Sequence, residues 1–292
     1  MSRTARVTAQ AKINLVLRVL ARESTGYHSI ETVMLRLDLG DEVCVRPTSG
    51  RALDVAGPAM PRDGLGAVEK NLAFRAAVAY ADATGWPDGF AIEIEKRIPV
   101  GGGLGGGSAD AGAVLRALDA LSPNPLGARL VELATSLGAD VPFMTIESPM
   151  ALAWGRGERL FPLRALDARP VLLAIPDFSV VTAEAYAWLS SDRGTYTPEA
   201  AVLAPESLAT WESIAPLAMN DFEHVVARRH PVVDSLVRRF EDLGALVAMM
   251  SGSGSTVLGI FTKLANAALV GVSGVNTAET RTSERVFRVE MD

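Results

Sequence analysis

The period of the hydrophobic pattern changes abruptly in the first half of the chain. Over residues 90–98 apolar residues alternate with small or charged ones, which is typical of a half-buried strand. Over 108–121 the apolar residues recur at helical spacing, and Ser108 is a suitable N-cap for that helix. The pattern therefore predicts a strand, a loop and a helix in direct succession.

The same reading outlines the rest of the chain. The expected elements are two strand-like runs within 3–20, a hairpin or meander over 31–56 with a turn at 39–42, helices over 69–83 and 125–137, a strand over 171–175, and two strands, 247–250 and 257–261, around a glycine–serine loop. Because a new apolar strand opens after residue 160, we expect two domains, 1–160 and 161–292.

Composition narrows the class of protein. The 292 residues are 49% hydrophobic, which supports a sizeable core, and the net charge of −6 without a basic run argues against a nucleic-acid surface. A single cysteine, Cys44, excludes an intramolecular disulfide. The uncharged stretch 243–262 is as long as a membrane span, but a serine–glycine segment at 251–256 interrupts it. With no apolar run typical of a signal peptide near the N-terminus, we expect a cytoplasmic protein, and no protein partner is implied.

The loop between the predicted strand and helix is unusually rich in glycine. Six of the eleven residues from Pro99 to Ala109 are glycine. Glycine lets backbone N–H groups approach a ligand closely, and the first N–H groups of the following helix lie at the positive end of its dipole. Phosphate binding is therefore favoured over a structural turn. The loop differs from the G-x-x-x-x-G-K-[ST] pattern because no lysine follows its last glycine, and a dinucleotide-binding unit would require an N-terminal strand and a later acidic residue that are missing.

Several polar residues outside the loop have two interpretations. Lys12 and Asn14 lie one pleat apart on the same side of a strand, and spacing alone favours a solvated face. Asp140, in a tight Gly-Ala-Asp-Val-Pro connection, is by itself more often a turn residue than a catalytic carboxylate. Lys96 fits an exposed strand end as well as a nucleotide site, and Tyr186 fits helix packing as well as ligand stacking.

Three motifs taken together resemble those of the GHMP small-molecule kinases. They are the glycine-rich segment 95–112, the pair of segments 11–15 and 26–28, and the serine–glycine segment 250–255, which span almost the whole chain. Within that superfamily they are most similar to the kinases that act on a cytidyl-diphosphate alcohol. The resemblance implies an α+β, two-domain GHMP kinase fold. Its N-terminal ATP-binding domain would resemble the second domain of ribosomal protein S5, its C-terminal domain would be ferredoxin-like, and the active site would lie between them.

The resemblance also implies a reaction. It is the transfer of phosphate from ATP, with Mg²⁺, to the 2-hydroxyl of the small molecule 4-diphosphocytidyl-2-C-methyl-D-erythritol, a step of non-mevalonate isoprenoid synthesis. Asp140 would accept the proton of that hydroxyl, and Lys12 would hold Asp140 ionised and stabilise developing charge. Ser108 would contact the magnesium ion.

The remaining site residues are expected in two groups. The nucleotide would lie against Asn71, Lys96, Pro99, Gly101, Gly102, Gly103, Leu104, Gly105, Gly106, Gly107, Ser108, Ser251, Gly252, Ser253 and Gly254. The cytidyl substrate would lie against Asn14, Tyr27, His28, Thr182 and Tyr186, with the two tyrosines on either side of the cytosine.

Two departures from the family pattern lie beside the functional positions. Thr25 replaces the usual aspartate before Gly-Tyr-His, and Gln10 replaces the usual proline before Ala-Lys-Ile-Asn. One alternative function is another kinase of the superfamily, of the homoserine or mevalonate type, which would not need Tyr27, His28 and Tyr186 as a base clamp. The other is a non-catalytic nucleotide-binding protein, for which we would expect Lys12 or Asp140 to be missing.

Overall fold

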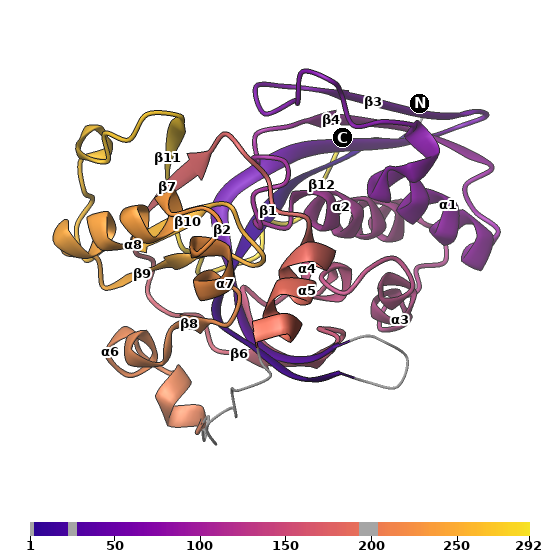
Figure 1. Cartoon of the computed structure of the whole chain (residues 1–292). Coiled ribbons are helices and arrows are strands. Elements are labelled where there is room, and N and C mark those ends of the chain that lie inside the picture. Colours follow the sequence, from indigo (N-terminus) through magenta and orange to yellow (C-terminus); the bar gives the residue numbers. More distant parts are fainter. Residues whose placement is uncertain (1–2, 23–27, 193–203) are drawn as a thin grey trace.

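Two β-sheets and the helices that cover them make up the molecule (Figure 1). The computed structural model describes residues 3–22, 28–192 and 204–292. Helices and strands alternate irregularly along the chain, which confirms the predicted α+β class. Among the residues so described, no helix is both long enough and apolar enough to cross a bilayer.

The larger sheet has eight strands. Its main path runs in the order β12-β1-β2-β4-β3, while β5 joins β2 to β6 and β8 pairs with β1. The strands are β1 (Ala5–Arg22), β2 (His28–Thr48), β3 (Arg51–Ala56), β4 (Gly89–Glu95), β5 (Met150–Gly155), β6 (Arg159–Leu163), β8 (Met219–Asn220) and β12 (Glu290–Met291). The β1–β2 ribbon curves through the whole molecule and connects its two halves (Figure 1).

Four helices belong to the half of the molecule that contains this sheet. They are α1 (Leu72–Thr84), α2 (Gly106–Leu121), α3 (Arg129–Thr135) and α4 (Val141–Thr145), and a 3-10 turn, Val68–Lys70, precedes α1. Asn71 caps α1, because its side chain accepts a hydrogen bond from the N–H of Ala73 at 2.9 Å. The central helix α2 contacts β1, β2, α1 and α4, so it forms the middle of the core.

The smaller sheet has four antiparallel strands in the order β11-β7-β10-β9. Its strands are β7 (Pro170–Pro176), β9 (Val247–Met250), β10 (Val257–Ile260) and β11 (Val275–Arg281). The order is the one expected of a ferredoxin-like unit, and the stretch 243–262 forms the predicted strand, loop and strand. The helices of this half are α5 (Thr182–Asp192), α6 (Trp211–Ile214), α7 (Glu223–Ala227) and α8 (Val232–Asp242), with 3-10 turns at Pro205–Leu208, Ala215–Leu217 and Ala267–Leu269.

The two long strands differ from the prediction. We expected two runs within 3–20 and a turn at 39–42, but β1 and β2 are each continuous. Their pairing changes register, since Gln10 lies opposite Gly40 whereas Lys12 lies opposite Arg36. The extra residues of β2 form a bulge rather than a reversal, which bends the ribbon without ending it.

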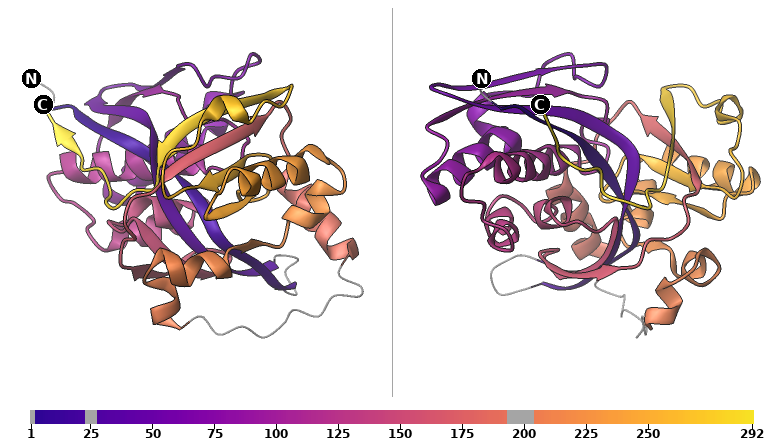
Figure 2. Two further views of the ribbon diagram at one scale, coloured as in Figure 1. Left: turned by 90° about the vertical axis from the view of Figure 1, so that its left-hand side faces the viewer. Right: turned by 180° about the vertical axis from the view of Figure 1, so that it is seen from behind.

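The two halves share secondary structure and core. Strands β8 and β12 come from the second half of the chain but complete the first sheet, and β12 pairs with the start of β1, with Met291 opposite Ala5 (Figure 2). One apolar cluster includes Ile13 of β1, Leu173 of β7 and Leu258 of β10. The predicted boundary at residue 160 lies within β6, and the division into two domains there stays a prediction.

Candidate active site

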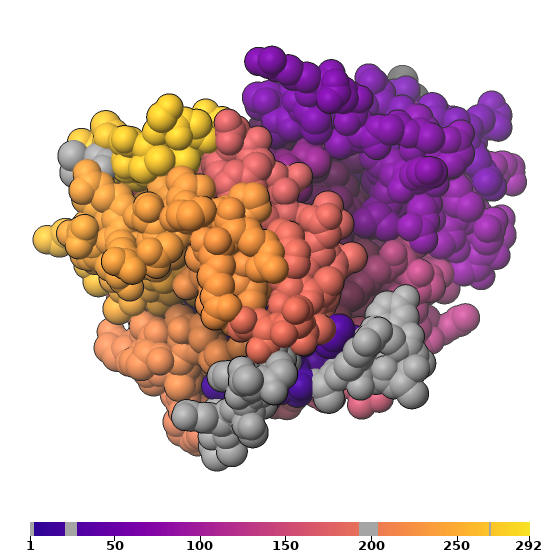
Figure 3. All heavy atoms as spheres, viewed as in Figure 1, coloured from indigo at the N-terminus to yellow at the C-terminus, as the bar shows by residue number. Residues whose placement is uncertain are grey.

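A cleft of about 1650 Å³ opens between the two halves of the molecule. Figure 3 shows the hollow between the salmon atoms of α5 and the violet and magenta atoms of the N-terminal half. The predicted residues that line it are Lys12, Asn14, His28, Asn71, Lys96, Pro99, Gly101–Gly107, Ser108, Asp140, Thr182, Tyr186, Gly252, Ser253 and Gly254. The structure therefore gathers these expected residues, from seven separate stretches of the chain, around one space.

The glycine-rich loop forms one wall of this cleft. Gly101, Gly103 and Gly105 have φ angles of 78°, 79° and 71°, which other residues adopt only with strain. The first hydrogen bond of α2 runs from the N–H of Ala109 to the carbonyl of Gly105, at 2.8 Å. The amides of residues 106–108 therefore have no partner within the helix and are suited to binding an anion.

The start of α2 corrects one detail of the prediction. Ser108 was expected to be the N-cap, but the helix begins at Gly106 and its N-cap is Gly105. The left-handed conformation of Gly105 turns the chain into the helix three residues earlier than predicted. Ser108 consequently lies in the first turn, where its hydroxyl lines the cleft.

Lys12 and Asp140 form an ion pair at the centre of the cleft. The Lys12 ammonium lies 3.3 Å from the Asp140 carboxylate and donates a hydrogen bond to Asn14 Oδ1 at 2.7 Å. Asn14 in turn donates to Thr32 Oγ1 at 2.8 Å. The Lys12 side chain is only 5% exposed whereas that of Asp140 is 33% exposed. The lysine is therefore fixed by the sheet, and the carboxylate faces the space where a substrate would bind.

The local fold leaves the Asp140 carboxylate available. Asp140 occupies the N-cap position of α4, but its side chain caps no backbone N–H of that helix. On the opposite side of Lys12, the backbone N–H of Lys12 donates to the carbonyl of Leu104 at 3.0 Å. This bond connects β1 directly to the glycine loop and sets the distance between the ion pair and the predicted phosphate site.

Lys96 lies in a buried cluster that the sequence analysis missed. Its ammonium donates to Asp41 and, at 2.7 Å, to Asp110, and all three side chains are almost fully buried. Burial raises the pKa of Asp110 to about 7, the Lys96 ammonium opposes the shift, and the negative charge of Asp41 adds to it. Burial alone would lower the pKa of Lys96, but Asp110 and Asp41 together raise it.

The cluster also fixes the entry into the glycine loop. Asp41 Oδ1 accepts hydrogen bonds from the N–H groups of Arg97 at 2.5 Å and Ile98 at 2.8 Å. Asp110 lies one turn into α2, within the glycine-rich segment 95–112 that resembles the GHMP kinases, so the sequence could have indicated it as a site residue. Asp41 was not identified because it lies within residues 39–42, which were predicted to form a turn.

The serine–glycine loop of the second half closes against the glycine loop. Ser251 is buried behind the cleft, where its hydroxyl donates to the carbonyl of Gly103 at 3.1 Å, so it joins the two loops instead of lining the cavity. Asn220, which the sequence analysis did not single out, donates to the carbonyls of Met250 and Gly252, both at 2.8 Å. Ser253 and Thr182 lie at the mouth with their hydroxyls 2.9 Å apart.

Aromatic side chains gather at one end of the cleft. The ring of Tyr186 stacks on His28 at a centroid distance of 4.7 Å and meets Phe222 edge-on at 4.8 Å. Burial, with a smaller contribution from Asp140, raises the pKa of Tyr186 to about 12, so its hydroxyl is neutral near pH 7. Tyr27, expected to face Tyr186 across a base, lies outside the described residues. Phe222 was missed because its contacts depend on the approach of α7 to α5.

The chain matches protein families and a protein of known function along most of its length. The family described as GHMP kinases N terminal domain matches residues 71–148, and GHMP kinases C terminal matches 203–272. A 4-diphosphocytidyl-2-C-methyl-D-erythritol kinase from Desulfotalea psychrophila is 38% identical over 97% of this chain and 93% of its own length.

Two solved kinase structures have the same fold as this chain. A crystal structure of 4-(cytidine 5'-diphospho)-2C-methyl-D-erythritol kinase has 36% identity and a TM-score of 0.78, covering 95% of this chain and 98% of that one. Homoserine kinase from Cytophaga hutchinsonii shares the fold at 19% identity, with a TM-score of 0.70 over 99% of this chain and 97% of its own. The Desulfotalea psychrophila protein and the solved cytidyl kinase match this chain at 38% and 36% identity over most of their length. The chain therefore belongs to the 4-diphosphocytidyl-2-C-methyl-D-erythritol kinase family of GHMP kinases.

Proposed function

We propose that the protein transfers the γ-phosphoryl group of ATP to the 2-hydroxyl of 4-diphosphocytidyl-2-C-methyl-D-erythritol, giving ADP and the 2-phosphate. The observation that carries the proposal is the Lys12–Asp140 pair, 3.3 Å apart, in the same cleft as the glycine loop. A carboxylate beside a phosphate-binding loop suits phosphoryl transfer to an alcohol, because such catalysis depends mainly on positioning and charge stabilisation.

The nucleotide would bind along the glycine loop. The free amides of residues 106–108 and the dipole of the 16-residue helix α2 favour the phosphates there. Asn71 and Lys96 line the part of the cleft beyond this turn, and Gly252, Ser253 and Gly254 would cover the phosphates from the second half.

Asp140 would act as the proton acceptor. The substrate oxygen attacks the γ-phosphorus, the bond to the β–γ bridging oxygen breaks, and the hydroxyl proton moves to the Asp140 carboxylate. Lys12 would hold that carboxylate in place and stabilise negative charge on the transferred group. Asn14 keeps the ammonium aimed at the cleft through its 2.7 Å hydrogen bond.

The cytidyl end would bind at the aromatic end of the cleft. A flat base is held well by ring faces, and base stacking contributes about 1–3 kcal/mol. Tyr186 and His28 supply rings, and Ser190 contacts His28 at 3.2 Å between Nε2 and Oγ. We propose that Tyr27 completes this base site and that Thr182 contacts the substrate between the base and the reacting alcohol.

Magnesium fits this arrangement as an ion held largely by the nucleotide. No group of three or more histidine, cysteine or acidic side chains is placed to hold a metal within 3–22, 28–192 and 204–292. Mg²⁺ commonly keeps phosphate and water ligands and needs few from the protein, and Ser108 offers one hydroxyl oxygen in the first turn of α2. When bound, the ion neutralises charge on the phosphates.

The substrate assignment is tested by ADP release from ATP and Mg²⁺ with three alcohols: the cytidyl-methylerythritol compound, homoserine and mevalonate. We expect turnover with the cytidyl compound alone, and phosphorus NMR should place the new phosphate on the 2-hydroxyl. Turnover with homoserine or mevalonate in its place would contradict the proposed base site while preserving the kinase assignment.

A further inference from the structure

Arg36 is a fully buried cation on the inner face of β2. It is 1% exposed, and none of the carboxylates in the described part of the chain forms an ion pair with it. Its guanidinium donates instead to three backbone carbonyls, those of Phe143 at 2.6 Å, Ile146 at 3.1 Å and Ser148 at 3.3 Å. Burial, with a smaller effect of Arg116, lowers the pKa of Arg36 to about 9, so it remains charged at neutral pH.

Those carbonyls belong to the C-terminal end of α4 and the turn after it. A positive side chain at that end satisfies the last carbonyls and opposes the negative pole of the helix. The opposite end of α4 carries Asp140. With five residues, α4 is far too short to be stable alone, so its position is determined by its tertiary contacts.

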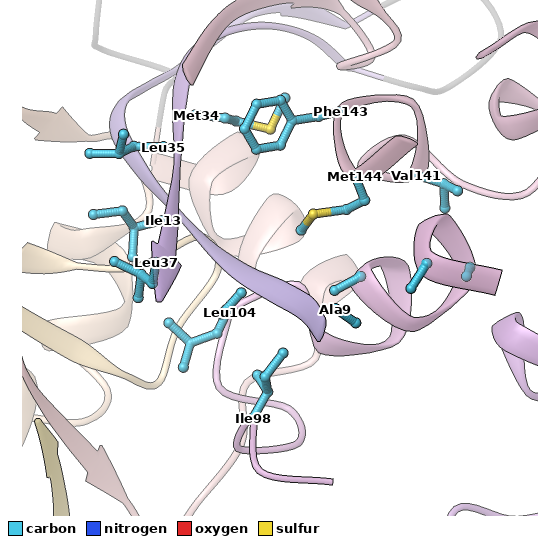
Figure 4. Packing of buried hydrophobic residues seen from close by; sticks show 14 of the residues in the cluster. Ala9, Ile13, Met34, Leu35, Leu37, Ile98, Leu104, Val141, Phe143 and Met144 are labelled. Atoms are coloured by element: carbon cyan, nitrogen blue, oxygen red, sulfur yellow. The ribbon is translucent and has the colours of Figure 1, made fainter. Parts of the chain in front are cut away.

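The other contacts of α4 are apolar. A Cβ built on Gly112 of α2 would lie 2.7 Å from Met144 Cβ, so the absence of a side chain at Gly112 is what allows α2 to approach this closely. Figure 4 shows Phe143 and Met144 of α4 among the buried apolar side chains of the core cluster, which also includes Met34 of β2. The Arg36 guanidinium lies 5.0 Å from the centre of the same Phe143 ring. Apolar contacts hold the side of α4, and Arg36 fixes its end.

We infer that Arg36 is a positioning residue for phosphoryl transfer, which anchors α4 so that the Asp140 carboxylate at the far end lies against Lys12. The inference rests on the proposed role of Asp140. At a rise of about 1.5 Å per residue, α4 is only about 7–8 Å long, so a shift at its anchored end reaches Asp140. A misplacement of about 1 Å can lower the rate about 100-fold.

The test compares two arginines. Arg18 provides the control, because its side chain is only 19% exposed and contacts Glu31 at 3.6 Å and Met219, which belong neither to α4 nor to the turn after it. We expect Arg36→Met to lower kcat about 10- to 100-fold while KM for ATP changes less than threefold. Arg18→Met should also lower thermal stability but change kcat less than threefold. Equal losses of kcat in both variants would overturn the inference.

A double-mutant cycle separates positioning from general stability. In an Asp140→Asn background, Arg36→Met should change the residual kcat less than twofold, because the group that Arg36 positions is already disabled. The same proportional loss in both backgrounds would contradict the inference. If Asp140→Asn alone turned over like the wild type, the proposed catalytic role itself would fail, which is a distinct outcome.

A second variant keeps the test decisive if Arg36→Met does not fold. Gly112→Ala retains Arg36 but introduces a methyl group that overlaps Met144, and it should displace α4 from the opposite side. It should lower kcat with little change in KM for ATP, and this loss should also vanish in the Asp140→Asn background. An unchanged kcat in a folded Gly112→Ala variant would contradict the anchoring of Asp140 through α4.

Discussion

Three ionisable side chains, Lys96, Asp41 and Asp110, are buried together beneath the first turn of α2. Two carboxylates face one ammonium, so the cluster has one negative charge in excess when all three are ionised. One oxygen of Asp110 is buried without a hydrogen-bond partner. The excess charge and the unsatisfied oxygen both make ionised Asp110 costly in the folded protein.

The first prediction concerns the pH dependence of stability. In the folded protein the pKa of Asp110 is raised from 3.8 to about 7. Between these values the native state holds a proton that the unfolded chain has released, so this group makes stability fall as pH rises. We expect Asp110→Asn to remove that fall. Its free energy of unfolding relative to wild type should rise from pH 5 to pH 8 by up to about 3 kcal/mol.

Urea denaturation at the two pH values measures this difference. Asp54→Asn on the exposed face of β3 makes the same chemical change without the burial and serves as the control. A difference between Asp110→Asn and wild type that stays constant from pH 5 to pH 8 would mean that Asp110 keeps its ordinary ionisation in the fold.

Residue types and motifs identified Lys12 and Asp140 from the sequence, because their neighbours along the chain resemble a known pattern. The partners that fix these groups were not predictable. Lys96 meets Asp41 across 55 positions, and Arg36 meets Phe143 across 107. A buried arginine without a carboxylate has no local sequence signal, since its acceptors are backbone carbonyls that every residue possesses.

At the scale of elements, the two glycine-bearing loops are built to touch. A Cβ on Gly103 would lie 2.2 Å from the carbonyl oxygen of Ser251, and its φ of 79° already disfavours any side chain. Gly244 after α8 has a similar φ of 81° but nothing within 4 Å of the position of a Cβ. Alanine substitutions at Gly103 and Gly244 therefore separate the cost of backbone strain, which both share, from the cost of pushing the two loops apart, which only Gly103 has.

We therefore predict different outcomes for the two alanine variants. Gly244→Ala should cost about 1–2 kcal/mol of stability from the left-handed conformation, with kinetics unchanged. Gly103→Ala should be less stable than Gly244→Ala and should raise KM for ATP at least 10-fold. Thermal unfolding and initial rates measure both effects. Equal KM values for ATP in the two variants would show that contact between the loops does not matter for the nucleotide.

Element types followed well from the sequence, but one glycine was misread. Gly40 and Asp41 look like a turn, yet β2 continues through them without a break. A Cβ on Gly40 would lie 2.6 Å from Thr8 Cγ2 and 2.9 Å from the carbonyl oxygen of Ala9, so close pairing with β1 requires glycine there. Glycine is favoured both in a tight turn and where two strands pack closely. Only the pairing with β1 shows which of the two reasons applies at Gly40.

At the scale of the whole molecule, the cleft depends on both halves. Composition shifts along the chain suggested a boundary near residue 160, but they could not reveal that β8 and β12 return to the first sheet. Asn220, at the end of β8, holds the serine–glycine loop against the glycine loop. The long β1–β2 ribbon carries Lys12 into the cleft, while α5 brings Tyr186 from the second half.

The most direct test of the account is the turnover of Asp140→Asn with ATP, Mg²⁺ and the cytidyl-methylerythritol substrate. The substitution keeps the size of the side chain but removes its charge and its ability to accept the hydroxyl proton. We predict a loss of kcat of about 10²–10⁴-fold, with the dissociation constant of a non-hydrolysable ATP analogue within threefold of wild type. Turnover close to wild type would contradict Asp140 as the proton acceptor and with it the assignment of the cleft as the site of phosphoryl transfer.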